Sequence, residues 1–311
     1  MAGVALTLAA ASAAPPAPPA GVTITVATWN VAWFGDGEGD GALTGNREGG
    51  RHLRGPEDFA RLRAVALRIE ALGADLVSLQ EMENRAAAAR LFPESDWELF
   101  VSSRNPDPAW SQRTALAVRR DAGWTVERHP DVIEWSPQGR DRYGVDLTLG
   151  RGAERVRVLA VHFQSGCQYD ALRSARRQCG VLRMQFAVLK GWLHERMAEG
   201  FPVVVAGDWN RFLSRPGADA VPTFPVRPLI LPRPGRAPAC WDGHFDNYVD
   251  HILAFPPAGD AVKGSGVEEI LYRAPLTLRD RLSDHCPLSA TLHFFRRRPP
   301  PPAGDALSAS R

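Results

Sequence analysis

A carboxylate and an amide directly follow a short apolar run in Val203-Val204-Val205-Ala206-Gly207-Asp208-Trp209-Asn210. Runs of this kind are typical of a buried strand. Far downstream, Ser283-Asp284-His285-Cys286-Pro287 comes just before another apolar run. Cleavage of a phosphate ester needs a carboxylate to activate the nucleophile, and an imidazole or a metal to stabilise charge on the phosphoryl oxygens. Because strand ends can hold such groups still, the two segments together favour a metal-dependent phosphoesterase.

Strand-like and helix-like patterns alternate along the first half of the chain. Small and β-branched residues alternate over 22–29, apolar residues recur at helical spacing over 57–72, and another strand is predicted at 75–80. The longest predicted helix covers 176–197 and has one apolar face. Further strands are predicted at 97–101, 114–118, 156–163, 203–206, 248–255 and 288–295. This order of elements predicts a mixed α/β sandwich.

The composition allows a large core but does not identify a partner. Hydrophobic residues make up 44% of 311 residues, which is enough to exclude disorder over most of the chain. The formal net charge is only +2, and Lys190 and Lys263 are the only lysines. Arginine forks suit phosphates. However, alanine, glycine, proline and arginine are all abundant, as a biased codon composition would produce, so charge gives no argument for a nucleic-acid partner.

Both ends of the chain differ in composition from the middle. Residues 1–21 resemble an export signal, with an apolar stretch followed by small residues, although positive residues near the start are missing. From 296 to 311, an arginine and proline run followed by small residues predicts a disordered tail. The folded domain is therefore expected at 22–295. No apolar stretch reaches about 18 residues, so a transmembrane segment is not expected.

Four cysteines are present, and none has the close paired spacing of a zinc site. Cys167 and Cys179 bracket a polar segment that a disulfide could close, contributing about 3 kcal/mol in the chain-entropy model. The disulfide and export would support each other, which favours a secreted or periplasmic protein. Reduced thiols in a cytoplasmic enzyme remain the alternative. Cys286 is expected to pack as a small apolar residue under the site.

Six short segments place polar residues at the ends of apolar strands. Their polar residues, in chain order, are Asn30, Glu81, His162, Asp208 with Asn210, Asp250, and Asp284 with His285. That order resembles the endonuclease/exonuclease/phosphatase superfamily, the deoxyribonuclease I-like fold, over about residues 22 to 295. The resemblance implies a single-domain, four-layer α/β/β/α sandwich with two packed mixed β-sheets.

The resemblance also implies a metal site and a set of catalytic roles. Glu81 is expected to bind Mg²⁺ or Mn²⁺, with Asn30 supporting the metal or the substrate phosphate and Asp284 lying beside the metal. Asp208 is expected to deprotonate the attacking water, and Asn210 to hold that water or a phosphate oxygen.

Two histidines and an arginine complete the implied site. His285 would hydrogen-bond the scissile phosphate while Asp250 grips its other ring nitrogen, fixing the tautomer and raising the pKa of His285. His162 is a candidate acid for the leaving oxygen or a phosphate ligand. Arg142 is a candidate phosphate contact, with Arg140 as an alternative.

Several other residues carry weaker signals. Ala32 stands where abasic-site nucleases of the superfamily have a second aspartate, so an abasic-site repair role is disfavoured. His251 follows Asp250 in one strand and should point to the opposite face in a structural role. The segment at 36–47 resembles the start of a calcium loop, but its twelfth position is Arg47, so a solvated loop is favoured over Ca²⁺.

The resemblance leaves the substrate open. A nuclease acting on DNA or RNA, most simply as a monomer, is the leading hypothesis; residues suited to grip a nucleic acid are Arg47, Arg51, Arg54, Trp110 and Arg113. The main enzymatic alternative is a phospholipid or small-molecule phosphoester, with Trp110 and the segment 222–225 available as apolar loop tips. A binding protein that has lost turnover is a third possibility.

Overall fold

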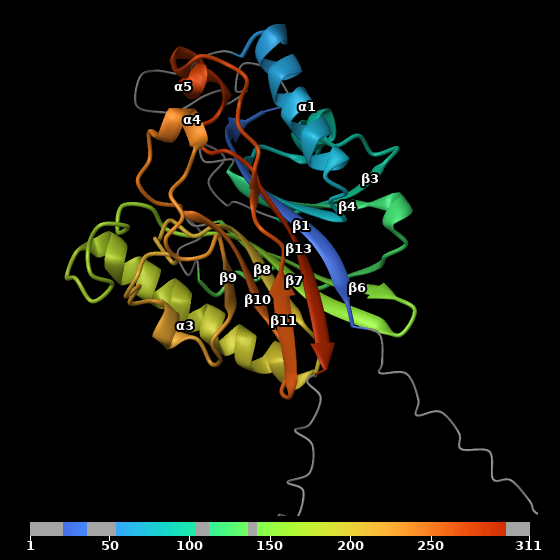
Figure 1. Cartoon of the computed structure of the whole chain (residues 1–311), viewed down its shortest axis with the longest axis vertical. Helices are drawn as coiled ribbons and strands as arrows, with labels where there is room; N and C mark the ends of the chain where they lie inside the picture. The colour runs from blue at the N-terminus through green and yellow to red at the C-terminus, as the bar shows by residue number, and fades with distance from the viewer. Residues whose placement is uncertain (1–20, 36–53, 104–111, 136–141, 297–311) are drawn as a thin grey trace, which may run out of the picture.

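Two β-sheets pack face to face, and helices cover their outer faces (Figure 1). The computed structural model describes residues 21–35, 54–103, 112–135 and 142–296. The helices α1 (Pro56–Ala71) and α3 (Arg177–Ala198) lie on opposite sides of the paired sheets. This is the four-layer α/β/β/α sandwich that the resemblance implies. Apart from their innermost residues, the predicted leader and tail lie outside the described residues.

The first sheet has seven strands in the order β11-β13-β1-β2-β4-β3, with β12 paired to β13. The strands β1 and β2 are parallel and are joined through α1, which makes this sheet mixed. The other pairings described in it are antiparallel. The strand bounds are β1 (Thr23–Phe34), β2 (Leu76–Met82), β3 (Trp97–Val101), β4 (Arg113–Arg119), β11 (Asp260–Gly264), β12 (Glu268–Glu269) and β13 (Leu288–Arg296).

The second sheet has six strands in the order β5-β6-β7-β8-β10-β9. Its parallel pair, β7 and β8, is joined through α3, and its other described pairings are antiparallel. The bounds are β5 (Thr125–Arg128), β6 (Val145–Arg151), β7 (Glu154–His162), β8 (Val203–Asp208), β9 (Leu229–Leu231) and β10 (Asp250–Phe255).

Short helices occupy the loops. Their bounds are α2 (Arg85–Leu91), α4 (Cys240–Gly243) and α5 (Arg279–Leu282), with 3₁₀ turns η2 (Arg120–Ala122), η3 (Val221–Thr223) and η4 (Leu276–Leu278). At the start of α1, Gly55 donates its backbone N–H to the Asp58 carboxylate at 2.9 Å, which satisfies a donor at the helix end. None of the helices in the described part of the chain combines the length and apolar character that crossing a membrane requires.

Three apolar layers hold the sandwich together. The central layer lies between the sheets and includes Ile24, Val158 and Ile252; the outer layers lie under α1 and under α3. Each fully buried aliphatic side chain contributes about 1.5 to 3 kcal/mol. Along β1, β7, β8 and β10, successive side chains alternate between the central layer and an outer layer, as the two-residue period of a strand requires. This alternation decides which polar side chains meet at the sheet edge.

A glycine brings two strands of the second sheet close together beside the site. Gly207 has φ +157°, and a Cβ at this position would lie 1.9 Å from the carbonyl oxygen of Val161 in β7. Any side chain would therefore push β7 away from β8. The register of this parallel pair places His162 level with Asp208, so glycine at 207 holds these two residues together.

Candidate active site

The strand period brings polar residues of both sheets into one place. On its strand, each of Asn30, His162, Asp208 and Asp250 shares a face with side chains of the central apolar layer, such as Val26 in β1. The registers pair Asn30 with Gln80, and Asp208 with both His162 and Asp250. The four side chains therefore continue the layer between the sheets, at the edge where the parallel strands end.

Glu81 joins this group because its backbone breaks the alternation of β2. A regular strand would turn Glu81 to the same side as Leu79, which packs in the layer under α1. Glu81 instead has φ +63°, a left-handed conformation that is uncommon for a non-glycine residue. Its carboxylate accepts hydrogen bonds from Asn30 Nδ2 at 3.2 Å and from the backbone N–H of Trp33 at 2.9 Å. Such conformations persist where surrounding contacts support them, and they gather at functional sites.

Asp208 is the hub of the cluster. Its Oδ2 accepts a hydrogen bond from Asn30 Nδ2 at 3.1 Å, and lies 3.3 Å from His162 Nε2 and 4.0 Å from His285 Nε2. Burial alone would raise the pKa of Asp208, but the hydrogen bond with His162, the positive charge of His285 and the hydrogen bond from the backbone N–H of Asn210 outweigh burial and hold its pKa well below the usual range. Asp208 is therefore an ionised carboxylate at neutral pH.

Asn210 is fixed against the same carboxylate. Its backbone N–H donates to Asp208 Oδ1 at 2.8 Å, and its Nδ2 donates to the carbonyl of Phe163 at 3.0 Å and to Asp208 Oδ2 at 3.1 Å. Asn210 also has a positive φ of 47°. The amide is thus rigidly placed, and it lines the hollow that contains His285.

His285 and Asp250 form a short, buried pair. His285 Nδ1 lies 2.7 Å from Asp250 Oδ2, while Asp250 Oδ1 is buried without a hydrogen-bond partner. Burial disfavours the charged imidazole, but the carboxylates of Asp250 and Asp284 outweigh it and raise the pKa of His285 well above 6.5. Burial also raises the pKa of Asp250, to about 6. At neutral pH the pair is an imidazolium held by a carboxylate.

His162 has the opposite electrostatic character. Burial, together with the positive charge of Arg142, lowers the pKa of His162, although Asp208 and Glu81 oppose this shift. Its Nε2 lies between Asp208 and Glu81, 3.8 Å from Glu81 Oε1, and its Nδ1 is buried without a partner. A neutral imidazole at this place can orient both carboxylates. Arg142 itself donates from Nη2 to Gln112 Oε1, and Arg140 lies outside the described residues.

The charges and donor atoms of the cluster fit a divalent cation. Four carboxylates gather here, those of Glu81, Asp208, Asp250 and Asp284, while His285 supplies one of the few positive charges. Buried negative charge in excess is stable only when paired or bound to a metal. Asp208, Asp250 and His285 offer ligand atoms within 4.8 Å of one another, and Glu81 adds a hard oxygen donor to the same cluster. Oxygen donors of this kind suit Mg²⁺ or Mn²⁺. The predicted calcium segment at 36–47 lies outside the described residues.

Arg54 holds together the end of β1 and α5 beside the site. Arg54 is 7% exposed, and its guanidinium donates to the carbonyls of Val31, Ala32, Trp33, Arg281 and Leu282 at 2.6 to 3.1 Å. Burial lowers the pKa of Arg54 to about 10, so the side chain remains charged. The interpretation of Arg54 as a nucleic-acid contact is therefore wrong, because backbone carbonyls use its donors.

Ser283 links the loop that carries His285 to Asn30 in β1. Its hydroxyl donates to the carbonyl of Asn30 at 2.8 Å and accepts from the backbone N–H of His285 at 3.0 Å. Its place in the Ser-Asp-His sequence was the only signal that could have identified it. Of the other residues predicted to contact a nucleic acid, Arg113 donates to the carbonyl of Glu83. Arg47, Arg51 and Trp110 lie outside the described residues.

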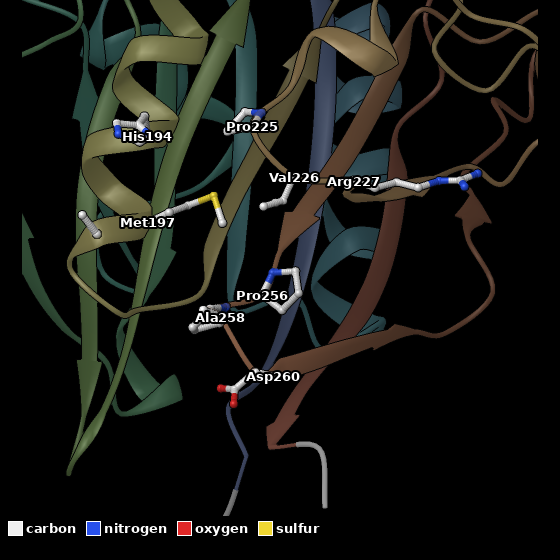
Figure 2. A pocket seen from close by; sticks show the side chains of 11 residues that line it. His194, Met197, Pro225, Val226, Arg227, Pro256, Ala258 and Asp260 are labelled. Atoms are coloured by element: carbon white, nitrogen blue, oxygen red, sulfur yellow. The ribbon is translucent and has the colours of Figure 1, made fainter. Parts of the chain in front are cut away.

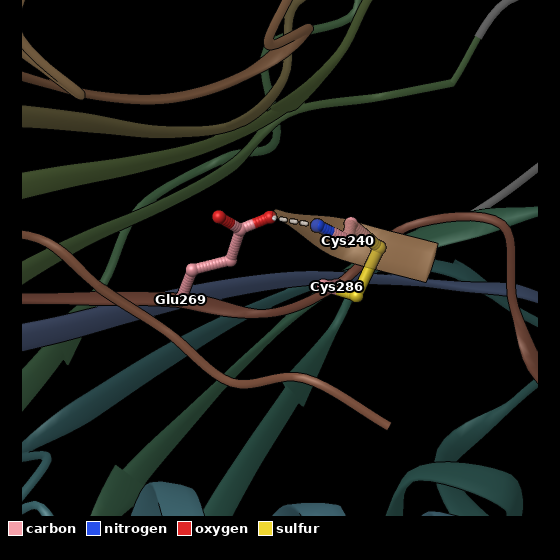
Figure 3. Close-up of side chains that lie close together, drawn as sticks. All are labelled: Cys240, Glu269 and Cys286. Carbon is pink, nitrogen blue, oxygen red and sulfur yellow. Dashed lines mark hydrogen bonds between the residues drawn. A yellow bond between two sulfur atoms is a disulfide. The ribbon is translucent and has the colours of Figure 1, made fainter. Parts of the chain in front are cut away.

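Two disulfides flank the cluster. Cys167 pairs with Cys179, the bridge that the sequence analysis predicts. Cys240 pairs with Cys286, which precedes Pro287 and follows His285 in sequence (Figure 3). Cys286 is buried in the apolar layer under α1, as expected, and the bridge is a covalent link that the sequence did not identify. Glu269 Oε1 accepts from the backbone N–H of Cys240 at 2.9 Å. Because the two sulfur atoms are bonded to each other, this group offers no thiolates to a metal.

His251 and a second hollow lie outside the cluster. His251 is fully buried on the opposite face of β10 from Asp250, and its Nε2 lies 3.2 Å from the backbone N–H of Leu213, in keeping with the predicted structural role. The second hollow, of about 450 Å³, lies between α3 and the turn after β10 and includes His194 and Met197 (Figure 2). Since β10 runs from Asp250 away to Phe255, this hollow is at the far end of the sheet.

Comparisons with known proteins agree with this geometry. Residues 27–285 match the Endonuclease/Exonuclease/phosphatase family. The uncharacterized protein YbhP of Escherichia coli (strain K12) is 26% identical over 243 residues, covering 73% of this chain and 86% of YbhP. Truncated TDP2 of Caenorhabditis elegans superposes with a TM-score of 0.56 at 21% identity, covering 88% of this chain and 98% of that one. D. rerio TDP2, complexed with a single strand DNA product, gives a TM-score of 0.56 at 16% identity over 87% of this chain and 98% of its own.

The matched region contains every residue of the cluster from Asn30 to His285 and includes strands of both sheets, although it ends before β13. Members of the matched family are hydrolases that act on phosphoester bonds. The chain belongs to the endonuclease/exonuclease/phosphatase family.

Proposed function

We propose that the protein is a metal-dependent phosphodiester hydrolase that cleaves nucleic acid. The observation that carries this proposal is the cluster around Asp208, in which a carboxylate of depressed pKa lies 4.0 Å from an imidazole of raised pKa. Titratable groups whose environments drive their pKa values apart are typical of acid-base sites.

Each residue then has a role that its environment supports. Asp208 is ionised, so it can orient the attacking water and accept its proton as the new P–O bond forms and the P–O bond to the leaving oxygen breaks. The leaving oxygen takes up a proton from solvent water. His285, charged and held by Asp250, donates a hydrogen bond to a phosphoryl oxygen on which negative charge grows. Asn210, held by Asp208 and Phe163, helps to fix the water or a phosphate oxygen.

The remaining residues serve the metal and the phosphate. Glu81, Asn30 and Asp284 would hold Mg²⁺ or Mn²⁺, which when bound supplies positive charge to the phosphoryl oxygens. The lowered pKa of His162 favours a neutral hydrogen-bond partner that orients Asp208, rather than the acid for the leaving group. The positive charge of Arg142 acts on His162, which supports a role for Arg142 in attracting the phosphate.

Two observations favour a nucleic-acid substrate over a phospholipid: one supports nucleic acid, and the other weakens the phospholipid alternative. D. rerio TDP2, similar in fold, is complexed with a single strand DNA product. Phe224, in the segment considered as a bilayer-contacting tip, is 7% exposed and packs edge-on against Trp209 and Phe255. A buried ring cannot enter a bilayer, so this support for the phospholipid alternative is lost. Trp110 lies outside the described residues.

A panel of substrates tests the proposal. Purified protein is incubated with plasmid DNA, RNA, sphingomyelin and bis(p-nitrophenyl) phosphate, with Mg²⁺ or with EDTA. We expect metal-dependent cleavage of nucleic acid and of the chromogenic ester, with losses of at least about 100-fold in Asp208→Ala and His285→Ala. His194→Ala, an exposed histidine in the distant hollow, is the matched control and should retain full activity. Equal rates in all four proteins would show that the cluster is not catalytic, and cleavage of sphingomyelin alone would make the protein a phospholipase.

The two disulfides are compatible with a secreted or periplasmic location, because such bonds persist in oxidising compartments. We propose export on this ground, and a monomeric enzyme as the simplest active form. Thiol labelling of protein from its native host tests the first point: resistance of all four cysteines to alkylation supports export, and free thiols support a cytoplasmic location. Light scattering of the active protein tests the second.

A further inference from the structure

A hollow of about 230 Å³ opens beside the catalytic cluster and has aromatic walls. Asn210, Asp284 and His285 line one side of it, and Tyr169, Phe212 and Phe245 are among its other lining residues. A phosphodiester held by Asn210 and His285 must place one of its two ester groups in or next to this hollow. The hollow therefore contacts one ester group of the substrate, whereas the catalytic residues contact the phosphate.

Tyr169 is unusual for its exposure. Its side chain is 77% exposed, the highest value among the exposed large hydrophobic residues in the described part of the chain. The ring meets the buried ring of Phe212 edge-on, with centroids 5.0 Å apart. Its neighbour supports the ring at one edge and leaves much of its surface open to solvent, which is the arrangement of a stacking surface.

The loop that carries Tyr169 is held in place on both sides of this residue. The Cys167–Cys179 disulfide fixes its start, and the buried guanidinium of Arg211 donates to the carbonyls of Cys167 and Asp170, the latter at 2.7 Å. Asp219 accepts from the backbone N–H of Leu172 at 2.7 Å. Since Arg211 follows Asn210 directly in sequence, these bonds also fix Tyr169 relative to the catalytic amide.

This anchoring explains why the exposed ring can contribute to binding. A side chain on a mobile loop loses conformational freedom when a ligand orders it, and that loss weakens binding. Tyr169 is already placed, so contact with a flat group costs little further order.

The charges around the hollow select against a second phosphate. Asp246, Glu269 and Asp284 line it, and the lining residues in the described part of the chain include no lysine or arginine. A phosphate placed among these carboxylates would be repelled, whereas an uncharged planar ring would not.

We propose that Tyr169, supported by Phe212, stacks an unpaired nucleobase adjacent to the scissile phosphate. This inference rests on the proposed nuclease function and deepens it. Stacking on a side chain needs a base whose face is free, as in a single strand, and it tolerates any base because every base has a π-face. The protein is then a nuclease of single-stranded nucleic acid with little sequence preference. Tyr169 is the residue that determines its specificity for unpaired bases.

The test compares two oligomers of equal length and charge, a thymidine oligonucleotide and one built from abasic tetrahydrofuran phosphates. Both are incubated with Mg²⁺ and the full-length protein, its Tyr169→Ala and Tyr169→Phe variants, and Leu67→Ala, which shortens an exposed side chain on α1. We expect Tyr169→Ala to lower kcat/KM on the thymidine oligomer about 10- to 100-fold, mainly through KM, and to change the abasic oligomer less than about twofold. Tyr169→Phe keeps the ring and should resemble the parent, as should Leu67→Ala.

The outcomes separate the two proposals. If the parent cleaves the thymidine oligomer and Tyr169→Ala does so equally well, or if Tyr169→Ala weakens both oligomers alike, the stacking surface is refuted and the nuclease assignment stands. If the parent cleaves plasmid DNA or RNA but neither oligomer in Mg²⁺ or Mn²⁺, the stacking surface fails and the proposed function stands. If the parent cleaves no nucleic acid at all, both proposals fail. Circular dichroism of Tyr169→Ala should match the parent, because the side chain is exposed.

Discussion

Replacing Asp250 with asparagine should move the pH range in which the enzyme works. The substitution keeps the size of the side chain and an oxygen that can accept from His285 Nδ1, but it removes the negative charge 2.7 Å from the ring. Opposite charges at such range attract by about 4 kcal/mol at the effective dielectric near a protein surface. Asp208 and Asp284 remain and keep part of this attraction. We therefore expect the pKa of His285 to fall in Asp250→Asn, because an opposite charge beside the imidazolium is removed.

The sign of the change in activity follows from which form of His285 is needed. The raised pKa keeps His285 charged at neutral pH, and the charged form is lost as pH rises through that pKa. In Asp250→Asn the alkaline fall of kcat/KM should therefore begin at lower pH, and activity well above the new pKa should be at least about tenfold below the parent.

The assay is the pH dependence of kcat/KM for bis(p-nitrophenyl) phosphate in Mg²⁺, with an NMR titration of the His285 ring in parallel. Thermal unfolding controls for folding at each pH. If the alkaline fall stays at the same pH while the folded variant loses activity, Asp250 does not act through the charge of His285, and the reasoning is refuted.

Four further variants, two single and two double, test the metal site, the role of Arg54 and the disulfides. Glu81→Gln should raise the Mg²⁺ concentration needed for half-maximal activity and reduce the thermal stabilisation by Mg²⁺, since it removes a hard charged donor; unchanged metal dependence in both assays would remove Glu81 from the metal site. Arg54→Lys should lower the free energy of unfolding by about 2 to 5 kcal/mol in urea titrations, because lysine cannot reach all of the carbonyls to which Arg54 donates. A loss below about 0.5 kcal/mol would show that these hydrogen bonds do not stabilise the fold. Cys240→Ala with Cys286→Ala should lower the free energy of unfolding by about 4 kcal/mol and should also lower kcat, because His285 is displaced. Cys167→Ala with Cys179→Ala should lower the free energy of unfolding by about 3 kcal/mol and leave kcat largely unchanged. Equal effects of the two double variants on kcat would show that the Cys240–Cys286 disulfide does not position His285.

The positions of the strand-end residues could be predicted because strand geometry is local. The apolar runs before His162 and Asp208 predict buried strands, and the two-residue period then fixes which face each polar side chain takes. Glu81 could be assigned to the same edge as Asn30, but its left-handed backbone could not be predicted, because it is accompanied by a contact with Trp33 at the end of β1.

The parts of the site that could not be predicted depend on closure of the whole fold. Arg54 looked like any exposed arginine in a glycine-rich loop, and its burial requires α5, with Arg281 lying 227 residues further along the chain, to pack against it. Likewise, Cys240 and Cys286 carry no spacing signal, and Phe224 is buried only because α3 and β10 enclose it. By contrast, β6 alternates apolar and polar residues from Val145 to Leu149, so the signal for that strand was present and was missed.

A double-mutant cycle on Asp208 and His285 tests the central claim most directly, namely that residues from distant parts of the chain act at one centre. The parent, Asp208→Ala, His285→Ala and the double variant are compared by kcat/KM for one phosphodiester in Mg²⁺. Residues that act as a unit give strongly non-additive losses. We predict that the double variant is within about tenfold of the weaker single variant. Losses in kcat/KM that multiply fully would mean that the two side chains work independently, and would contradict the account.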